Sequence, residues 1–186
     1  MSETKVVTGV VRLSYVNVYE TRVVDDVDSG KYGCAILIPK TDKATIAKIN
    51  AAVEVAKEDG IKTKWGGKKP VNLKLPLRDG DEDKPEDEAY KGQYFINCNS
   101  NKQPGMVDAM CKPLIEPGAI YSGCYARVSI TFFPFDSQGS KGIAAGLNNI
   151  QKIRDGEPLA GGPTAEEDFG DGEGAKLAGI SDDDLI

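Results

Sequence analysis

The segment 123–133 alternates between two kinds of side chain, and it constrains the fold more than any other part of the chain. Successive side chains of a strand point to opposite faces, so a period of two residues predicts a strand. One face is small or apolar and is expected to be buried, whereas the other mixes aromatic, basic and hydroxyl groups. The buried face comprises Cys124, Ala126, Val128, Ile130 and Phe132, and the other comprises Tyr125, Arg127, Ser129, Thr131 and Phe133.

The rest of the pattern is typical of a turn-rich β protein with one helix. The 21 glycines among 186 residues favour many turns over a helical bundle. Period-two alternation and β-branched residues predict further strands. The expected fold is mainly β with one helix (α+β), a small Greek-key barrel with insertions. The further strands are expected at 5–15, 31–38, 92–98 and 141–153.

The one clear helix is expected over 42–59. Thr41 is the candidate N-cap, and Gly60 is the candidate residue that ends the helix. From Ile46 onwards, apolar residues recur at helical spacing, which predicts a helix that packs one face on a sheet. Residues 60–78 are expected to form an extended, glycine-containing arm.

The net charge of −6 hides a strong segregation of charge. Residues 155–186 contain ten acidic residues and one basic residue, and the segment 79–88 contains seven acidic residues and one basic residue. Residues 1–154 contain 22 basic and 19 acidic residues, a net of +3. The sequence therefore predicts a basic domain over 1–154 with an acidic loop, followed by a disordered acidic tail over 155–186.

Missing residue types exclude several kinds of chemistry. The chain has no histidine, which rules out imidazole bases, Ser-His-Asp triads and histidine-bound metals. No 18-residue apolar run and no apolar signal core are present, so no membrane partner is expected. We expect neither a metal nor a cofactor. Free buried thiols are favoured over a zinc site because no C-x2-C pair occurs among Cys34, Cys98, Cys111 and Cys124.

The polar face of 123–133 suits single-stranded nucleic acid. Aromatic rings stack on bases, arginine pairs with phosphate, and hydroxyl groups reach the backbone oxygens. We therefore expect Tyr125, Arg127 and Phe133 to contact DNA. By itself, this strand also fits an ordinary half-exposed sheet face.

A second basic and aromatic signal lies in 61–78, which contains no acidic residue. Trp65, the only tryptophan, lies beside two glycines, so its ring could swing onto a base while the lysines follow the backbone. The alternative is that Trp65 folds back onto the barrel as a plug. Together with weaker candidates on the first and last strands, the further expected DNA contacts are Arg12, Tyr15, Lys62, Lys64, Trp65, Lys68, Lys69, Lys74, Arg78, Lys141 and Lys152.

The acidic loop permits two alternatives to DNA binding. Clustered carboxylates bind divalent cations, so a metal-dependent nuclease could use Asp79, Asp81 and Asp83. A calcium loop would place glutamate at the twelfth position, but Glu88 is the tenth residue counted from Asp79. The other alternative is a protein-interaction module whose acidic segments mimic DNA. A solvated loop is the expected structure.

The last five residues combine an acidic run with an apolar tip. Such a peptide suits a partner that has a basic pocket with an apolar floor. A merely solubilising tail would not need the two apolar residues. The expected partner-binding residues are Asp182, Asp183, Asp184, Leu185 and Ile186.

Five stretches spread over the body form a distinctive set, which lies within about residues 5–168. With them the chain resembles a bacteriophage family once catalogued as a domain of unknown function and now regarded as single-stranded DNA-binding proteins. The resemblance implies an OB-fold and no enzymatic activity. The acidic end is similar in kind to the tips of bacterial and phage single-strand binders but departs from the common bacterial tip, which ends in Pro-Phe. The five stretches are 12–15, 64–67, 73–81, 121–125 and 146–152.

The expected function is to coat single-stranded DNA, with little sequence specificity, during phage replication or recombination. The expected location is the cytoplasm of the infected bacterial host. The tail is expected to recruit phage or host replication proteins, such as a polymerase, helicase or recombinase. The protein itself is expected to be a monomer or a homodimer.

Overall fold

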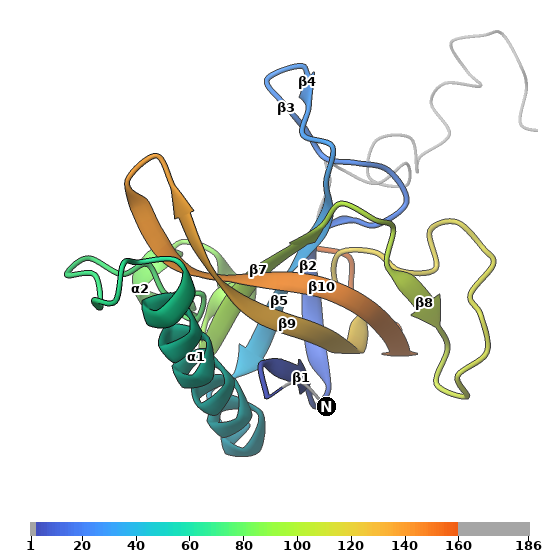
Figure 1. Cartoon of the computed structure of the whole chain (residues 1–186). Coiled ribbons are helices and arrows are strands. Elements are labelled where there is room, and N and C mark those ends of the chain that lie inside the picture. Colours follow the sequence, from blue (N-terminus) through green and yellow to red (C-terminus); the bar gives the residue numbers. More distant parts are fainter. Residues whose placement is uncertain (1–2, 160–186) are drawn as a thin grey trace, which may run out of the picture.

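The computed structural model describes residues 3–159, and its centre is a mixed β-sheet that curls into a partial ring (Figure 1). One long helix, α1, lies against this ring, and the connections carry short strands and turns. The elements are β1 (Lys5–Val7), β2 (Val11–Asn17), β3 (Val23–Val24), β4 (Val27–Asp28), β5 (Tyr32–Pro39), α1 (Lys43–Thr63), β6 (Arg78–Asp79), α2 (Gly80–Asp83), the 3₁₀ helix η1 (Glu88–Tyr90), β7 (Gln93–Ser100), β8 (Gly105–Val107), β9 (Tyr125–Ser137) and β10 (Ser140–Arg154).

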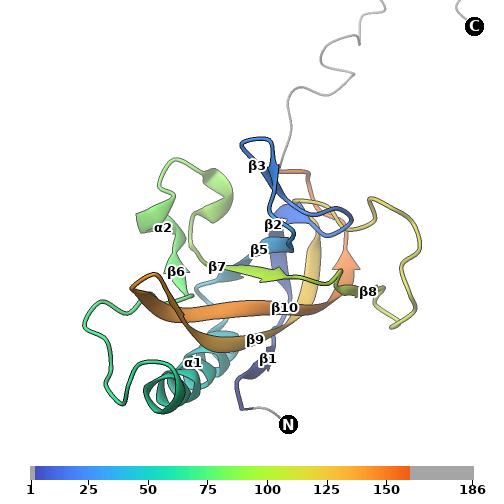
Figure 2. The ribbon, with the colours of Figure 1, turned by 45° about the horizontal axis from the view of Figure 1, so that its top comes forward.

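The ring consists of β9, β2, β5, β7 and β10, in that order, and the β9–β10 hairpin joins its ends. β10 runs parallel to β7, whereas the other neighbours in the ring are antiparallel. Only two residue pairs join β2 to β9, and two join β10 to β7, so the ring is partly open. This order confirms the predicted Greek-key barrel of OB type. Figure 2 shows α1 and the α2 segment on different sides of the ring.

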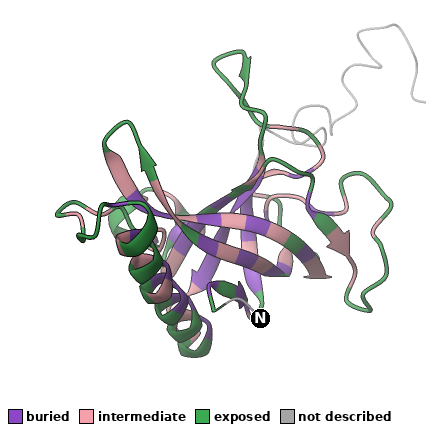
Figure 3. Ribbon diagram, in the orientation of Figure 1, coloured by how far each residue is buried: buried purple, intermediate pink, exposed green. Residues whose placement is uncertain are grey.

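The alternation predicted for 123–133 is confirmed in β9. Ala126, Val128 and Ile130 are fully buried in the ring, while Arg127 and Phe133 on the other face are exposed. The same inside–outside pattern runs along the other ring strands, and the two hairpin tips are exposed (Figure 3). The expected strand 5–15 is divided into β1 and β2, and β8 lies outside the expected strands.

Both predicted ends of the helix are wrong. The N-cap is Asp42, not Thr41, and its carboxylate accepts a hydrogen bond from the Thr45 N–H at 3.2 Å. The helix continues through Gly60 to Thr63. Glycine is needed at this position for packing instead, because a Cβ at Gly60 would lie 2.6 Å from the ring of Trp65.

The thiols are free, as expected, but not all of them are buried. Cys34, Cys98 and Cys124 lie in the core, with 3.7 Å between the sulfurs of Cys34 and Cys98, whereas Cys111 is exposed. Across residues 3–159, no group of three or more cysteine or carboxylate side chains is placed to hold a metal ion. In the same range, no helix is long and apolar enough to cross a membrane.

Candidate nucleic-acid interface

A groove of about 420 Å³ crosses the outer surface of β2, β5 and β7. Its floor is made of small residues and amides. Gly33 and Ala35 are buried in β5, and the neighbouring side chains of Asn97 and Asn99 on β7 are exposed. The groove is lined by Tyr15, Asn17, Arg22, Gly33, Cys34, Ala35, Lys84, Asn97 and Asn99.

The pairing of the strands aligns three of these positions with two on β10 and β9, which gives a row of five across the sheet. Asn17 pairs with Gly33, Gly33 with Asn99, Asn99 with Gly146, and Gly146 with Thr131. A Cβ at Gly33 would lie 2.4 Å from the amide oxygen of Asn99, so only glycine lets that side chain lie over β5. The row therefore exposes amide and hydroxyl groups that are separated by glycines, which have no side chain.

An exposed aromatic ring lies at each end of this row. Tyr15 is 55% exposed, and Phe133 on β9 is 46% exposed. A Cβ at Gly146 would lie 3.6 Å from the Phe133 ring, so that ring borders the row directly. Tyr15 has a φ of +48°, at the irregular pairing between Ser14 and Asn17. A bulky residue rarely adopts this left-handed backbone, and such strain is concentrated at functional sites.

Positive charge reaches the groove from two sides. Arg22 is exposed at the base of the β3–β4 hairpin, where its backbone N–H donates to Lys31 at 2.8 Å. Lys84 extends from the segment after α2, and its ammonium lies 5.2 Å from the centre of the Tyr15 ring. Figure 1 shows the β3–β4 and β9–β10 hairpins projecting beyond the ring at separate places. The groove thus combines stacking surfaces, hydrogen-bonding amides and cations.

The family described as "Enterobacter phage Enc34, ssDNA-binding protein" matches residues 4–183. The chain belongs to this family. Putative protein p50 of Acyrthosiphon pisum secondary endosymbiont phage 1 is 31% identical over 172 residues, which cover 87% of this chain and 90% of that protein. The resemblance seen in the sequence is confirmed. The Enc34 family consists of non-catalytic proteins, which sets the nuclease alternative aside.

Solved structures confirm the fold. The single-stranded DNA-binding protein of bacteriophage Enc34 in complex with ssDNA superposes with a TM-score of 0.75 at 25% identity, covering 84% of this chain and 90% of that one. The gp2.5 single-stranded DNA-binding protein of bacteriophage T7 superposes with a TM-score of 0.59 at 14% identity, covering 90% of this chain and 93% of that one. At that identity, the second match concerns the fold alone.

The prediction that Trp65 lies free in a flexible loop is wrong for this member of the Enc34 family. Its side chain is 5% exposed, and its indole N–H donates to the carbonyl of Phe135 at 3.1 Å. The ring fills the space above Gly60, between the end of α1 and the β9–β10 hairpin. Trp65 is therefore the plug that the sequence offered as the alternative.

Arg12 and Tyr125 lie outside the groove, on a separate hollow of about 210 Å³. The guanidinium carbon of Arg12 is 5.5 Å from the centre of the Tyr125 ring, and that of Arg154 is 3.8 Å from it. Arg12 also donates to the carbonyls of Gly123 at 3.1 Å and Glu157 at 2.7 Å. The bond to Glu157 holds the segment 155–159 against β2. Residues 160–186, including the expected partner-binding tip, lie outside the described residues.

Arg127 points outward on β9, as predicted, and helix α1 does not cover it. It is exposed, although its Nε donates to the carbonyl of Thr8 at 3.2 Å. It does not line the groove, so the alternating face of β9 contributes mainly its Phe133 end to this site. The predicted contact between Arg127 and DNA stays a prediction.

None of the predicted basic contacts of 62–78, nor Lys141 or Lys152, lines the groove. Lys74 is tied to β10 because its N–H donates to Lys141 at 3.0 Å and its carbonyl accepts from Ile143 at 2.9 Å. Arg78 and Lys152 are engaged in ion pairs, with Asp83 at 2.8 Å and with Asp155 at 2.6 Å. The exposed lysines at the end of α1 and just after it are Lys62, Lys64, Lys68 and Lys69.

The acidic segment 79–88 is solvated, as predicted, because most of its side chains are exposed, but it is not an irregular loop. β6, α2 and η1 fold it against the ring, where the Lys40 ammonium lies 2.7 Å from Asp79 and 2.8 Å from Asp81. Hydrogen bonding to Lys40 holds the pKa of both carboxyl groups below its ordinary value. These carboxylates are ionised and paired, so they complete the fold instead of forming an open cation site.

The groove residues that the sequence did not single out are Asn17, Arg22, Gly33, Ala35, Lys84, Asn97 and Asn99. A signal for two of them was present in the strand predicted over 92–98. Continued by one residue, its alternation places Asn97 and Asn99 on the face opposite Ile96 and Cys98. No such pattern marks Arg22 or Lys84, because both lie on irregular connections.

Proposed function

We propose that this chain binds single-stranded DNA along the groove over β2, β5 and β7, with little sequence specificity. The observation that supports this best is the row of amides and glycines between the exposed rings of Tyr15 and Phe133. Bases stack on the rings, since every base has a flat face, and phosphates lie near Arg22 and Lys84. The corresponding face of an OB-fold is where such barrels bind oligonucleotides.

The exposed lysines of 62–74 extend this path beyond the groove. They lie beside the β9–β10 hairpin, which carries Lys141. Cations there neutralise backbone phosphates and release counterions, so binding weakens as salt rises. The matching protein from phage Enc34, solved in complex with ssDNA, supports this assignment.

An acidic substitution on the groove floor tests the proposal. Asn99→Asp keeps the shape of the side chain but places a carboxylate in the path of the phosphates. A like charge at 4 Å opposes binding by about 1 kcal/mol in water and by more near a protein surface. We expect at least a fivefold loss of affinity for labelled oligo-dT, measured by fluorescence anisotropy with and without Mg²⁺.

The matched control is Asn50→Asp, which makes the same charge change on the exposed side of α1. It is expected to leave the affinity nearly unchanged. Equal losses in both variants would indicate a general charge effect and would place the DNA elsewhere. If a chain that ends near residue 154 bound no nucleic acid, the DNA-mimicking alternative would be favoured instead.

The acidic tail has a proposed second role in recruiting a replication protein of the phage or its host, in the cytoplasm of the infected cell. Its ten acidic residues and single basic residue are tethered close to a basic surface. The tail therefore competes weakly with phosphates, and DNA that displaces it frees the apolar tip for a partner.

Removing residues 160–186 is expected to raise DNA affinity at low salt, and the gain should shrink as salt screens the tail. The measurement is a salt series with the full-length and the truncated chain. Equal affinities at low salt would contradict the competition. A pull-down with a peptide of the last eight residues tests recruitment separately.

A further inference from the structure

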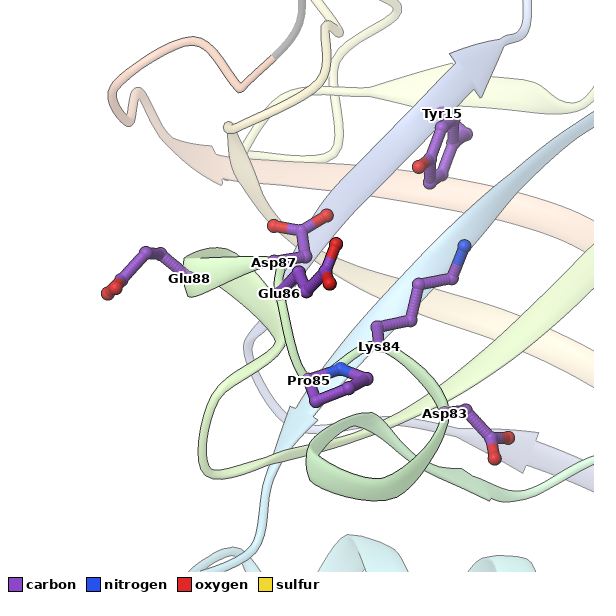
Figure 4. Close-up of a pocket in the computed structure, with 7 residues that line it drawn as sticks. All are labelled: Tyr15, Asp83, Lys84, Pro85, Glu86, Asp87 and Glu88. Carbon is purple, nitrogen blue, oxygen red and sulfur yellow. The ribbon is translucent and has the colours of Figure 1, made fainter.

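Lys84 lies at the boundary between two hollows, one lined by amides and cations and the other lined by carboxylates. On one side is the proposed DNA groove of about 420 Å³, and on the other is a hollow of about 640 Å³ whose wall carries four carboxylates. Tyr15 and Lys84 line both hollows, and Figure 4 shows the lysine side chain extending toward the tyrosine ring. A DNA strand that leaves the groove past Tyr15 therefore meets Lys84 before it meets the acidic wall.

The ammonium of Lys84 lies on aromatic rings although carboxylates surround it in sequence. It is 5.2 Å from the centre of the Tyr15 ring and 5.6 Å from that of Tyr90. None of the ion pairs found within residues 3–159 includes Lys84. The neighbouring Asp83 is paired with Arg78 at 2.8 Å, and Asp87 accepts from the Ala89 N–H at 3.1 Å. The lysine is thus held at the ring and not neutralised.

The backbone of Lys84 is fixed at this position. Its N–H donates to the carbonyl of Gly80 at 2.9 Å, and its carbonyl accepts from the Asp87 N–H at 3.1 Å. Gly80 is buried against the carbonyls of Tyr90 and Gln93, where a Cβ would lie within 2.7 Å of both oxygens. Only the side chain of Lys84 is left to move between alternative partners.

We propose that Lys84 is a phosphate contact that rests on Tyr15 until DNA binds. A base then takes its place against the Tyr15 ring, and the ammonium turns to the phosphate of the same nucleotide. The exchange is favourable because a stacked base interacts with the ring more strongly than an exposed ammonium does. The adjacent carboxylates, which repel phosphate, make Lys84 the last cation on this side of the groove. This inference rests on the proposed function.

The test uses the full-length chain with Lys84→Met, which keeps the apolar stem and removes the charge. Binding of oligo-dT is measured over a salt series. Loss of one phosphate contact reduces the slope of log affinity against log salt by about 0.7. Lys84→Arg is expected to retain the slope. The matched control is Lys91→Met, because Lys91 is exposed just after η1 and does not line the groove, and this variant is also expected to retain the slope.

A double-mutant cycle with Tyr15→Leu tests the exchange itself. In the native chain, binding must displace the ammonium from the ring, whereas in Tyr15→Leu it need not. The loss caused by Lys84→Met should therefore be about two- to fivefold larger in the Tyr15→Leu background, the size of an exposed cation–π contact. Additive losses would overturn the exchange and leave a simple phosphate contact.

The remaining outcomes separate this inference from the proposed function. An unchanged salt slope in Lys84→Met, together with weaker binding by Tyr15→Leu, would overturn the role of Lys84 and leave the groove in place. If neither Tyr15→Leu nor Asn99→Asp weakened binding, the groove assignment would fail, and this inference would fail with it. Thermal unfolding midpoints equal to that of Lys91→Met show that Lys84→Met is folded, and Lys84→Gln provides a second uncharged variant.

Discussion

Replacing Trp65 with alanine is expected to lower the free energy of unfolding by about 3–5 kcal/mol, the range for removing a large buried aromatic side chain. The ring is 5% exposed and fills the space between Gly60 and the β9–β10 hairpin. The β9–β10 hairpin cannot move in to fill the cavity left by the indole, because strand pairing within the barrel holds it in place. Urea unfolding followed by circular dichroism measures the change.

Trp65→Phe separates the packing of the ring from its hydrogen bond. This variant keeps most of the apolar volume and loses the bond to the Phe135 carbonyl, so we expect a loss that includes about 1 kcal/mol for that bond. The chain has a single tryptophan, and its fluorescence therefore reports on this site alone. Strong acrylamide quenching in the DNA-free protein would contradict the burial of the ring.

The barrel was predictable because its signal is local and repeats every two residues. In β9, the alternation of Ala126, Val128 and Ile130 with polar residues fixes which face is buried, whatever the neighbouring strands are. The order of the strands and the parallel pairing of β10 with β7 are not local. The strand pattern predicted a Greek-key barrel and the resemblance to a family implied an OB-fold, but neither specified this parallel pairing.

The end of α1 was not predictable from local rules. A glycine after an apolar stripe usually ends a helix, but Gly60 lies inside α1 because Trp65 packs on it. The wrong end of the helix and the wrong prediction of a free Trp65 therefore have one cause, the packing of Trp65 on Gly60. The Trp65 ring packs on a glycine only five residues earlier, but its hydrogen bond to the Phe135 carbonyl on β9 comes from the tertiary structure, which no local rule contains.

The groove was mostly missed because its floor consists of residues without a strong chemical signal. Gly33 and Ala35 matter through their small size, and Asn99 matters through its position opposite Gly33. The prediction from basic and aromatic residues included Tyr15 and Phe133, which lie at the ends of the row. It also selected Arg12, which lies outside the groove and donates to two backbone carbonyls.

Removing both exposed rings of the groove is expected to produce the largest loss of DNA affinity. If Tyr15 and Phe133 each stack one base, Tyr15→Leu and Phe133→Leu each weaken binding by about 1–3 kcal/mol. Leucine retains apolar volume but has no flat face, so the loss reports stacking and not burial. Anisotropy with oligo-dT at constant salt measures both single variants and the double variant.

The two losses should be nearly additive. Tyr15 and Phe133 lie at opposite ends of a row that crosses four strand spacings of about 4.8 Å each, well beyond the range at which substitutions couple. The double variant is therefore expected to lose about 2–6 kcal/mol. Ile115→Ala is the control, since Ile115 is 88% exposed in the loop between β8 and β9, and its affinity should stay unchanged.

Stability separates a binding role from a structural one in the same variants. Phe133 is 46% exposed, and substitutions at such surface positions usually change the free energy of unfolding by at most about 0.5 kcal/mol. Tyr15→Leu also removes the contacts of that ring with Tyr90 and Lys84, so its stability is compared separately. A variant that loses DNA affinity at unchanged stability has lost a contact with DNA. If the double variant bound as tightly as the native chain, the bases would not stack in this groove. The exposed lysines of 62–69 would then be the first surface to test, because their substitution by glutamine flattens the salt dependence wherever the bases lie.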